Sequence, residues 1–360
     1  MNRPVRTQLF RVFSFIIVSL PMCLPLAAQT PSKSYQLDDC HFHLTNYIQK
    51  GINVHDLLDL MGDRVGRVAL FGIPLQQQWS YRNDGDRAPE YYLASDSPLY
   101  YYSFTDAYIA MQYRSLSKDE QARFDPMITG FNPADMYAAD HIRRVLQTFP
   151  GVFTGIGEFT IHKEFVSAKI PGEVASLQDR ALDQILHAAA EIGLVVLIHN
   201  DMDTPFPKAG SAPAYLEQMK ELVRRHPKTT IIWAHTGMGR IVRPVTGHAA
   251  IIEAILKDPA FDHLYFDISW NEVAKYFVAS PESTSIAAKL IEGHPDRFLF
   301  GTDEVAPPNQ KQYLRTYDQY APMWALLSAE AREKVLKRNY ERLFDEARVR
   351  VRAWEQAHSK

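Results

Sequence analysis

The sequence predicts an α/β protein folded as a single (β/α)8 TIM barrel. Short apolar runs, each about the length of one strand, recur along the chain from residue 35 onward. Amphipathic segments with helix start and stop signals separate them, and this alternation is typical of a parallel sheet covered by helices. The runs number eight, as in such a barrel, and a chain of 360 residues is long enough to form it. An open doubly wound sheet is the alternative.

The strands are predicted from runs that are apolar on both faces, which suits a parallel sheet covered by helices. Many of their residues are β-branched or aromatic, and Gly, Pro or Asp flanks the runs. The predicted strands are residues 35–41, 65–73, 127–131, 152–159, 194–199, 229–235, 264–268 and 298–302.

The helices are predicted from their end signals. Asn53 can cap a helix, Pro133 suits a first helical position, and Gly193 suits the left-handed position after a helix. The predicted helices are residues 53–61, 132–149, 177–192, 213–226, 251–257, 285–293 and 328–350.

Residues 1–28 predict a cleaved signal peptide for export to the periplasm. Three arginines give a positive start, residues 12–20 are apolar apart from two serines, and Ala27-Ala28 precedes Gln29. The apolar run is too short to span a membrane. A lipid-anchored Cys23 is disfavoured by the bulky residue before it. The mature chain, residues 29–360, is predicted to be one barrel domain.

Charge and cysteine content exclude some classes of protein. The formal net charge is −3, and losing the signal peptide removes three arginines and no acid. The mature chain is therefore acidic, so we expect no nucleic-acid partner, and no membrane partner after cleavage. Only two cysteines occur, which excludes a disulfide scaffold. A homo-oligomer stays an open alternative.

An aromatic-rich insertion follows the second predicted strand. Ten aromatic residues lie between Trp79 and Tyr113. In a barrel this segment emerges on the face that carries active sites, so it can wall or cap a substrate pocket. The alternative is a loop that packs on its own rings.

The first predicted strand ends in Asp39-Cys40-His41-Phe42-His43. Residues two apart on a strand point to the same side, so His41 and His43 can hold one metal ion. Cys40 points the other way and is expected to pack in the core.

Four further strands end in a side chain that can bind a metal, namely Glu158, His199, His235 and Asp303. The carboxyl ends of barrel strands converge on one face, so these groups are expected to meet. Mixed imidazole and carboxylate ligands suit Zn²⁺ best, and Mn²⁺, Co²⁺ or Fe²⁺ also fit.

This set of motifs resembles the amidohydrolase superfamily, in its amidohydrolase-related branch. The resemblance rests on Asp39-Cys40-His41-Phe42-His43, Gly155-Ile156-Gly157-Glu158-Phe159, His199, His235, Phe300-Gly301-Thr302-Asp303 and Asn339-Tyr340-Glu341-Arg342-Leu343-Phe344.

The resemblance implies a metal-dependent hydrolase whose activated water attacks a C–O or C–N bond of a small ester, lactone or amide. It implies that His41 and His43 bind the ion and that Asp303 contacts the ion and accepts the proton of the water. His199 would be a ligand of this ion, or would share a second ion with His235. His235 would bind a second ion, or orient the water and polarise the substrate.

Glu158 stands where many relatives carry a carboxylated lysine, so the resemblance leaves open whether one or two ions bind. Lys163 lies past the predicted strand end, which makes it a poor bridging ligand.

Candidate substrate-binding residues follow three strand ends. His162, Lys163 and Arg240 can contact a substrate carboxylate, and Trp270 can line the pocket. The alternatives are solvated loop charges, a helix start and core packing.

Three other functions stay open on the sequence. They are a metal-dependent decarboxylase, a phosphoester hydrolase, and a non-catalytic periplasmic protein that binds a metal or ligand. Asp303 disfavours the last, because storage of an ion needs no carboxylate beside the attacking water.

Overall fold

The computed structural model describes Met1 and residues 34–172 and 175–358. Apart from Met1, the predicted signal peptide of residues 1–28 lies outside the described residues. Among the described helices, none has both the length and the hydropathy needed to cross a membrane. The residues from Ser34 onward form one compact unit.

All strands of the main sheet are parallel, and their order follows the chain around the sheet. They are β1 (Leu37–His43), β2 (Val65–Phe71), β5 (Phe124–Ile128), β6 (Gly155–His162), β7 (Val195–Asn200), β8 (Ile231–Trp233), β9 (Leu264–Asp267), β10 (Phe298–Leu299) and β11 (Glu304–Val305).

The short strands β10 and β11 are the two ends of the eighth strand, and this strand closes the barrel. On one side, the Leu299 carbonyl accepts a hydrogen bond of 3.0 Å from the Ile268 amide, beyond β9. On the other side, the Phe300 carbonyl accepts from the Cys40 amide of β1 at 3.1 Å. The sheet therefore forms a ring, and the prediction of an α/β TIM barrel is confirmed.

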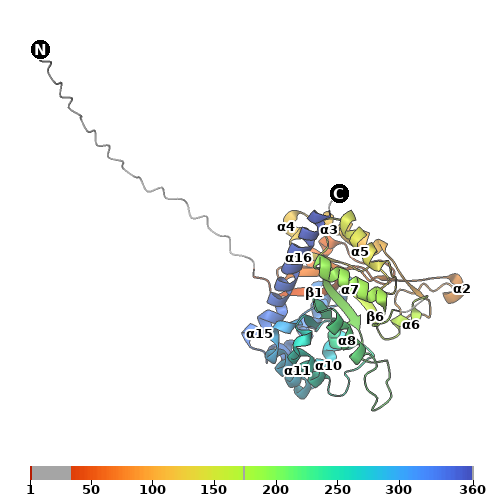
Figure 1. The fold of residues 1–360 in the computed structure, drawn as a ribbon. Helices are drawn as coiled ribbons and strands as arrows, with labels where there is room; N and C mark the ends of the chain where they lie inside the picture. The colour runs from red at the N-terminus through yellow and green to blue at the C-terminus, as the bar shows by residue number, and fades with distance from the viewer. Residues whose placement is uncertain (2–33, 173–174, 359–360) are drawn as a thin grey trace. The chain divides into compact units, whose positions relative to one another are not determined.

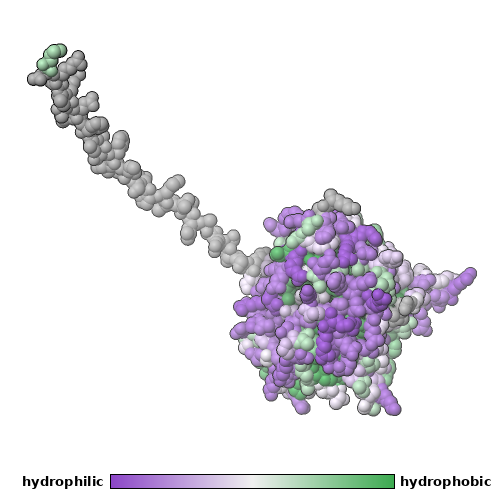
Figure 2. Space-filling model, viewed as in Figure 1, coloured by the Kyte–Doolittle hydropathy of each residue, from purple (hydrophilic) through white to green (hydrophobic). Residues whose placement is uncertain are grey.

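Helices cover the outside of the strands (Figure 1). Helix α7 (Arg180–Ile192) packs between α5 (Ala138–Thr148) and α16 (Asn339–Ala357). Outward-facing side chains on this face are mostly hydrophilic (Figure 2). The other principal helices are α1 (Val54–Met61), α3 (Phe104–Arg114), α8 (Leu216–Arg225), α9 (His248–Lys257), α10 (Asn271–Phe277) and α11 (Pro281–Gly293).

Two predicted helix ends are confirmed. The Asn53 side chain accepts hydrogen bonds from two amides at the start of α1. Gly193 ends α7 with a φ of 92°, which is the left-handed region that glycine adopts without strain.

Several predicted boundaries are wrong, and side-chain hydrogen bonds explain two of them. Helix α5 begins at Ala138, because the Asn132 side chain accepts a hydrogen bond from the Ala134 amide and forms a turn instead. The third barrel strand is Phe124–Ile128 rather than 127–131, because the Asp106 carboxylate binds the amides of the two residues after Ile128.

The segment between β2 and β5 contains a two-stranded antiparallel sheet, formed by β3 (Leu75–Gln77) and β4 (Leu99–Tyr101). Its rings divide into two groups. Tyr92 is buried in a small cluster with Tyr47 of the β1–α1 loop, whereas Trp79 and Tyr81 are exposed. Only part of the aromatic set is therefore placed against the barrel.

Candidate metal centre

The imidazoles of His41 and His43 face each other at the carboxyl end of β1. Their Nε2 atoms lie 3.3 Å apart. Asp303 Oδ1 lies 3.3 Å from the Nε2 of His41 and 3.0 Å from that of His43. The three side chains are buried, so the contacts lie where water screens little.

Neighbouring groups fix the orientation of both rings. His41 Nδ1 lies 2.9 Å from Asp267 Oδ2, and His43 Nδ1 lies 3.5 Å from the Gly72 carbonyl. These acceptors favour a proton on each Nδ1. Burial acts to lower the pKa of both rings, but Asp303 and the neighbouring carboxylates outweigh it and raise that pKa, so a proton on each Nε2 is favoured when no cation is bound. A cation that displaces these protons would meet two lone pairs and a carboxylate oxygen at one point.

Glu158 enters the same space from β6. Its Oε2 lies 3.4 Å from His43 Nε2, and its Oε1 lies 2.6 Å from His199 Nδ1. The preceding Gly157 has a φ of 118°, and a Cβ there would lie 2.1 Å from the Leu197 carbonyl oxygen. Only glycine fits this approach of β6 to β7, so Gly157 helps to place the carboxylate.

His235 follows β8 in a left-handed conformation, with a φ of 55°. Its backbone amide donates to Asp267 Oδ1 at 2.8 Å, and its Nδ1 lies 2.9 Å from Ser269 Oγ. Its buried Nε2 finds no hydrogen-bond partner among the described residues. This atom lies 3.7 Å from both Glu158 Oε1 and Asp303 Oδ2. An unpartnered buried nitrogen is costly, and a bound cation would satisfy it.

The carboxylates of the centre are held in the ionised form. Burial acts to raise the pKa of Glu158, but Lys163 and His199 outweigh it and hold that pKa well below its usual value. Burial opposes ionisation of Asp303 too, and its pKa is held far below normal chiefly by His41 and His43. Burial lowers the pKa of His235, so that ring is neutral. The centre thus combines two carboxylates with imidazole donors, a set that fits a divalent metal.

Within the described part of the chain, the possible ligands form two groups of close atoms, which share His41. One is His41, His43 and Asp303, and the other is His41, Glu158 and His235. His199 is in neither group, since its Nδ1 contacts Glu158 and its Nε2 lies 3.1 Å from Asp201 Oδ1. The structure brings all six predicted residues together, and the part of each as a metal ligand stays a prediction.

Replacing Glu158 with Gln is expected to lower both metal content and activity, because a charged oxygen facing the ligand cluster is lost. Elemental analysis then counts the ions. A fall from about two ions per chain to about one identifies a bridging carboxylate. An occupancy that stays near one, with activity about 10–100-fold lower, identifies Glu158 as a residue that orients a ligand. Wild-type activity would contradict both roles.

Two acidic residues of the centre were given no role in the sequence analysis, although Asp39 belongs to a motif quoted there. Asp267 supports His41 and His235, and Asp39 accepts hydrogen bonds from the Thr302 amide and hydroxyl at 2.8 and 2.6 Å. Burial raises the pKa of Asp39 to about 6. Asp267 had a usable signal, because it is an acidic residue at the end of an apolar run, as Asp303 is.

The Asp267→Asn protein is expected to bind metal about 10–100-fold more weakly, because a neutral amide no longer fixes the protonated Nδ1 of His41. Metal affinity measured by competition with a chelating dye tests this. Unchanged affinity would show that the ring keeps its position without the carboxylate. Asp140→Asn, on the surface of α5, is the control.

A pocket with a volume of about 200 Å³ opens beside His43 and Asp303. Of the predicted substrate-binding residues, Lys163, Arg240 and Trp270 line it, and His162 does not. The His162 ring instead stacks on Tyr215 with centroids 3.8 Å apart, and burial lowers its pKa to about 4.

Three cations and several rings line this pocket, and one of the cations, Arg315, is paired with the Glu304 carboxylate. The Arg240 guanidinium lies 5.5 Å from the Tyr91 ring centre and 5.6 Å from that of Trp270. Lys163 Nζ lies 5.4 Å from the Trp270 ring and 3.4 Å from Glu158 Oε1. Tyr47 and Tyr92 complete the aromatic lining. Such a wall suits a small, flat, negatively charged molecule.

The family model for amidohydrolases matches residues 38–345, nearly the whole described barrel. The chain belongs to the amidohydrolase family. The matched range contains every strand-end residue of the centre, and the family consists of enzymes that usually bind a divalent metal. No curated protein sequence matches this amidohydrolase.

Solved structures share the fold of this amidohydrolase at low identity. A protein from Pseudomonas putida described as a candidate 2-pyrone-4,6-dicarboxylic acid hydrolase is 14% identical, with a TM-score of 0.52 over 87% of this chain and 98% of its own. A dihydroorotase from Campylobacter jejuni is 14% identical, with a TM-score of 0.50 over 86% and 83%. A 2,6-dihydroxybenzoate decarboxylase is also 14% identical, with a TM-score of 0.50 over 87% and 98%.

Proposed function

We propose that this amidohydrolase is a metal-dependent hydrolase that cleaves a C–O or C–N bond in a small carboxylate-bearing ester, lactone or amide. One observation carries the proposal. The Nε2 atoms of His41 and His43 converge on the Asp303 carboxylate, beside the unpartnered Nε2 of His235.

Zn²⁺ is the ion we propose, with His41, His43 and Asp303 as ligands and Glu158, His199 and His235 as further candidates. When bound, such an ion makes water nucleophilic near neutral pH and polarises a carbonyl. Nitrogen and carboxylate donors in a buried site suit Zn²⁺ better than Ca²⁺ or Mg²⁺, which prefer oxygen ligands alone.

The chain's own residues supply the remaining chemistry. Asp303 is ionised and borders the pocket, so it can accept a proton from the attacking water and return it to the leaving group. His235 presents its Nε2 toward the same space and can contact the developing negative charge. Lys163 and Arg240 line the same pocket and can hold a substrate carboxylate.

Decarboxylation is the second candidate, and a specific observation favours it. The cations of the pocket wall would place a carboxylate close to the metal centre, and one structural neighbour is a 2,6-dihydroxybenzoate decarboxylase. The ligand set serves either reaction, since both need a polarised oxygen beside an acid–base group.

A panel of carboxylate-bearing lactones, esters, amides and hydroxybenzoates tests the proposal. We expect turnover that a chelator abolishes and that added Zn²⁺ restores. Incorporation of ¹⁸O from labelled water into the product identifies hydrolysis, whereas release of CO₂ identifies decarboxylation. Turnover that survives complete removal of metal would contradict both candidates.

We also propose that residues 1–28 are a signal peptide and that the mature enzyme acts in the periplasm. The arginine-rich start, the apolar run and Ala27-Ala28 support this. Amino-terminal sequencing of the exported protein tests it, with Gln29 expected first. A chain that keeps Met1, or that begins at a lipidated Cys23, would contradict it.

A further inference from the structure

The pocket wall is assembled from segments that are far apart in the sequence. Tyr91 and Tyr92 come from the insertion after β2, and Arg240 comes from the loop after β8. These segments belong to different βα loops, so the barrel strands by themselves do not fix the position of one against the other. Some other group must hold them together if the pocket is to keep its shape.

Glu164 connects these two segments. Its Oε2 accepts a hydrogen bond of 2.5 Å from the Tyr92 hydroxyl, and its Oε1 accepts one of 2.7 Å from the Ile241 amide. Its own amide donates to Asp201 Oδ2 at 2.7 Å. The residue is only 9% exposed and lies just beyond β6. The carboxylate of this buried residue thus joins the insertion to the β8 loop, and its backbone amide joins both to the end of β7.

Gly239 allows the β8 loop to come this close. A Cβ at this position would lie 3.0 Å from Glu164 Oε1 and 3.2 Å from Asp201 Oδ1. Gly239 therefore lies against two carboxylates of the chain itself.

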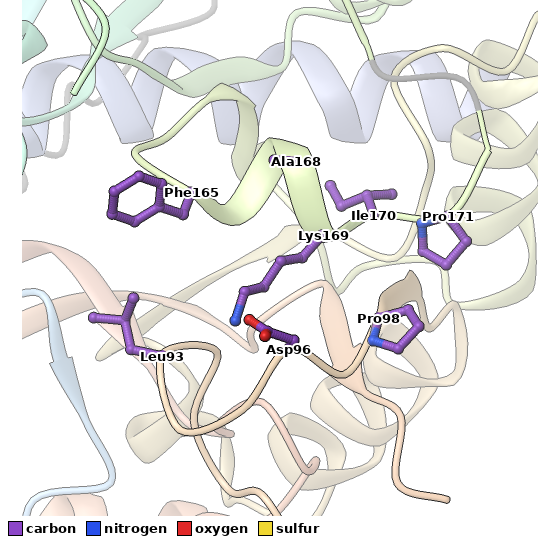
Figure 3. A pocket seen from close by; sticks show the side chains of 8 residues that line it. All are labelled: Leu93, Asp96, Pro98, Phe165, Ala168, Lys169, Ile170 and Pro171. Atoms are coloured by element: carbon purple, nitrogen blue, oxygen red, sulfur yellow. The ribbon is translucent and has the colours of Figure 1, made fainter. Parts of the chain in front are cut away.

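A second contact attaches the insertion to the same region. Lys169 of the short helix α6 (Val166–Lys169) donates to the backbone carbonyls of Tyr92 and Ser95. Figure 3 shows its amino group pointing from α6 toward the loop that carries Leu93 and Asp96. Residues 91–96 are therefore held at both their side-chain and backbone groups by the segment that follows β6.

We propose that Glu164 is a positioning residue that sets the substrate preference of this amidohydrolase by fixing Tyr91, Tyr92 and Arg240 in one pocket wall. The kind of molecule that this wall binds rests on the proposed function. The role of Glu164 in holding the wall together is independent of it. Glu164 does not touch the reacting atoms, and the Lys169 contacts assist it by holding the backbone of the insertion.

The chemistry of the carboxylate explains why glutamate stands here. Both of its oxygens accept a hydrogen bond, one from a hydroxyl and one from an amide. Glutamine has only one accepting oxygen, so it can accept from the Ile241 amide but must donate to the Tyr92 hydroxyl, which reverses that hydrogen bond and removes the charge that strengthens it. Tyr92 is 1% exposed, so its displaced hydroxyl proton does not readily find water as a new acceptor.

Hydrogen–deuterium exchange tests the connection without reference to activity. In Glu164→Gln and Tyr92→Phe proteins, the amides of residues 86–98 and 239–242 are expected to exchange about 10-fold faster, with metal content unchanged. Tyr340→Phe is the matched control, because it removes a buried hydroxyl whose partner is also a carboxylate, Asp125 at the other end of the barrel. Equal exchange rates in the wild-type and Glu164→Gln proteins would overturn the proposal. If Glu164→Gln does not fold, the same comparison is made with Tyr92→Phe.

Binding and kinetics test the consequence for the substrate. We expect the Kd of benzoate, used as an anionic aromatic probe, to rise about 10-fold in Glu164→Gln, and KM to rise more than kcat falls. The double variant Glu164→Gln/Tyr92→Phe should bind benzoate no more weakly than the more impaired of the two single variants. The reason is that both substitutions affect the same hydrogen bond, between Glu164 and Tyr92. Strictly additive losses, or a loss in kcat alone, would overturn the proposal.

The two proposals fail in different ways. If the wild-type protein binds neither metal nor benzoate, the proposed function fails, and faster exchange in the Glu164 variant still establishes the connection. If metal binding and turnover are normal in the Glu164 variant and its exchange matches wild type, only the positioning role fails.

Discussion

A His41→Ala protein is expected to contain no bound divalent ion and to have no metal-dependent turnover. His41 is the one residue common to both groups of candidate ligands, and its ring lies between His43, Asp303 and Asp267. Removing it also leaves the buried Asp267 carboxylate without its imidazole partner. We therefore expect a larger effect here than at any other position of the centre.

Elemental analysis of the purified variant, with activity measured after added Zn²⁺, checks this expectation. The matched control is His187→Ala, which removes an exposed imidazole on α7 and should keep full metal content. Because Asp267 loses a buried partner, thermal unfolding should be recorded for both variants. Full metal occupancy in a folded His41→Ala protein would disprove the assignment of His41 as a ligand.

An Asp303→Asn protein is expected to bind metal in excess Zn²⁺ but to turn over substrate about 10²–10⁴-fold more slowly, because an amide cannot accept the proton of the attacking water. The substitution keeps the size of the side chain and the left-handed backbone, whose φ is 51°. Asparagine tolerates this conformation better than most residues. The expected loss is therefore in chemistry rather than in folding.

The pH dependence separates this role from a structural one. His41 and His43 hold the pKa of Asp303 well below its usual value. The carboxylate is therefore ionised through the neutral range, and it becomes protonated, and unable to act as a base, only in strong acid. In the wild type, we expect turnover to fall at low pH as the centre takes up protons. A variant with wild-type turnover at saturating metal would exclude Asp303 as the base. Asp140→Asn again serves as the control.

Local sequence patterns were sufficient to predict the fold and the central residues of the site. Eight apolar runs predicted eight barrel strands, and the strand-end residues predicted which side chains meet. This worked because the carboxyl ends of barrel strands share one face whatever the loops do. The same logic was insufficient for His162, whose ring packs on Tyr215, because sequence position gives the end of a strand but not the rotamer of its last side chain.

The sequence by itself determined the barrel and brought His41, His43, Glu158, His235 and Asp303 to one face, because strand periodicity and parallel order are local properties. Only the tertiary structure decided which groups orient them. Asp267 is 226 residues from His41, and Tyr92 is 72 residues from Glu164. Such contacts depend on the paths of whole loops and on the packing that buries them, and no short stretch of sequence encodes either.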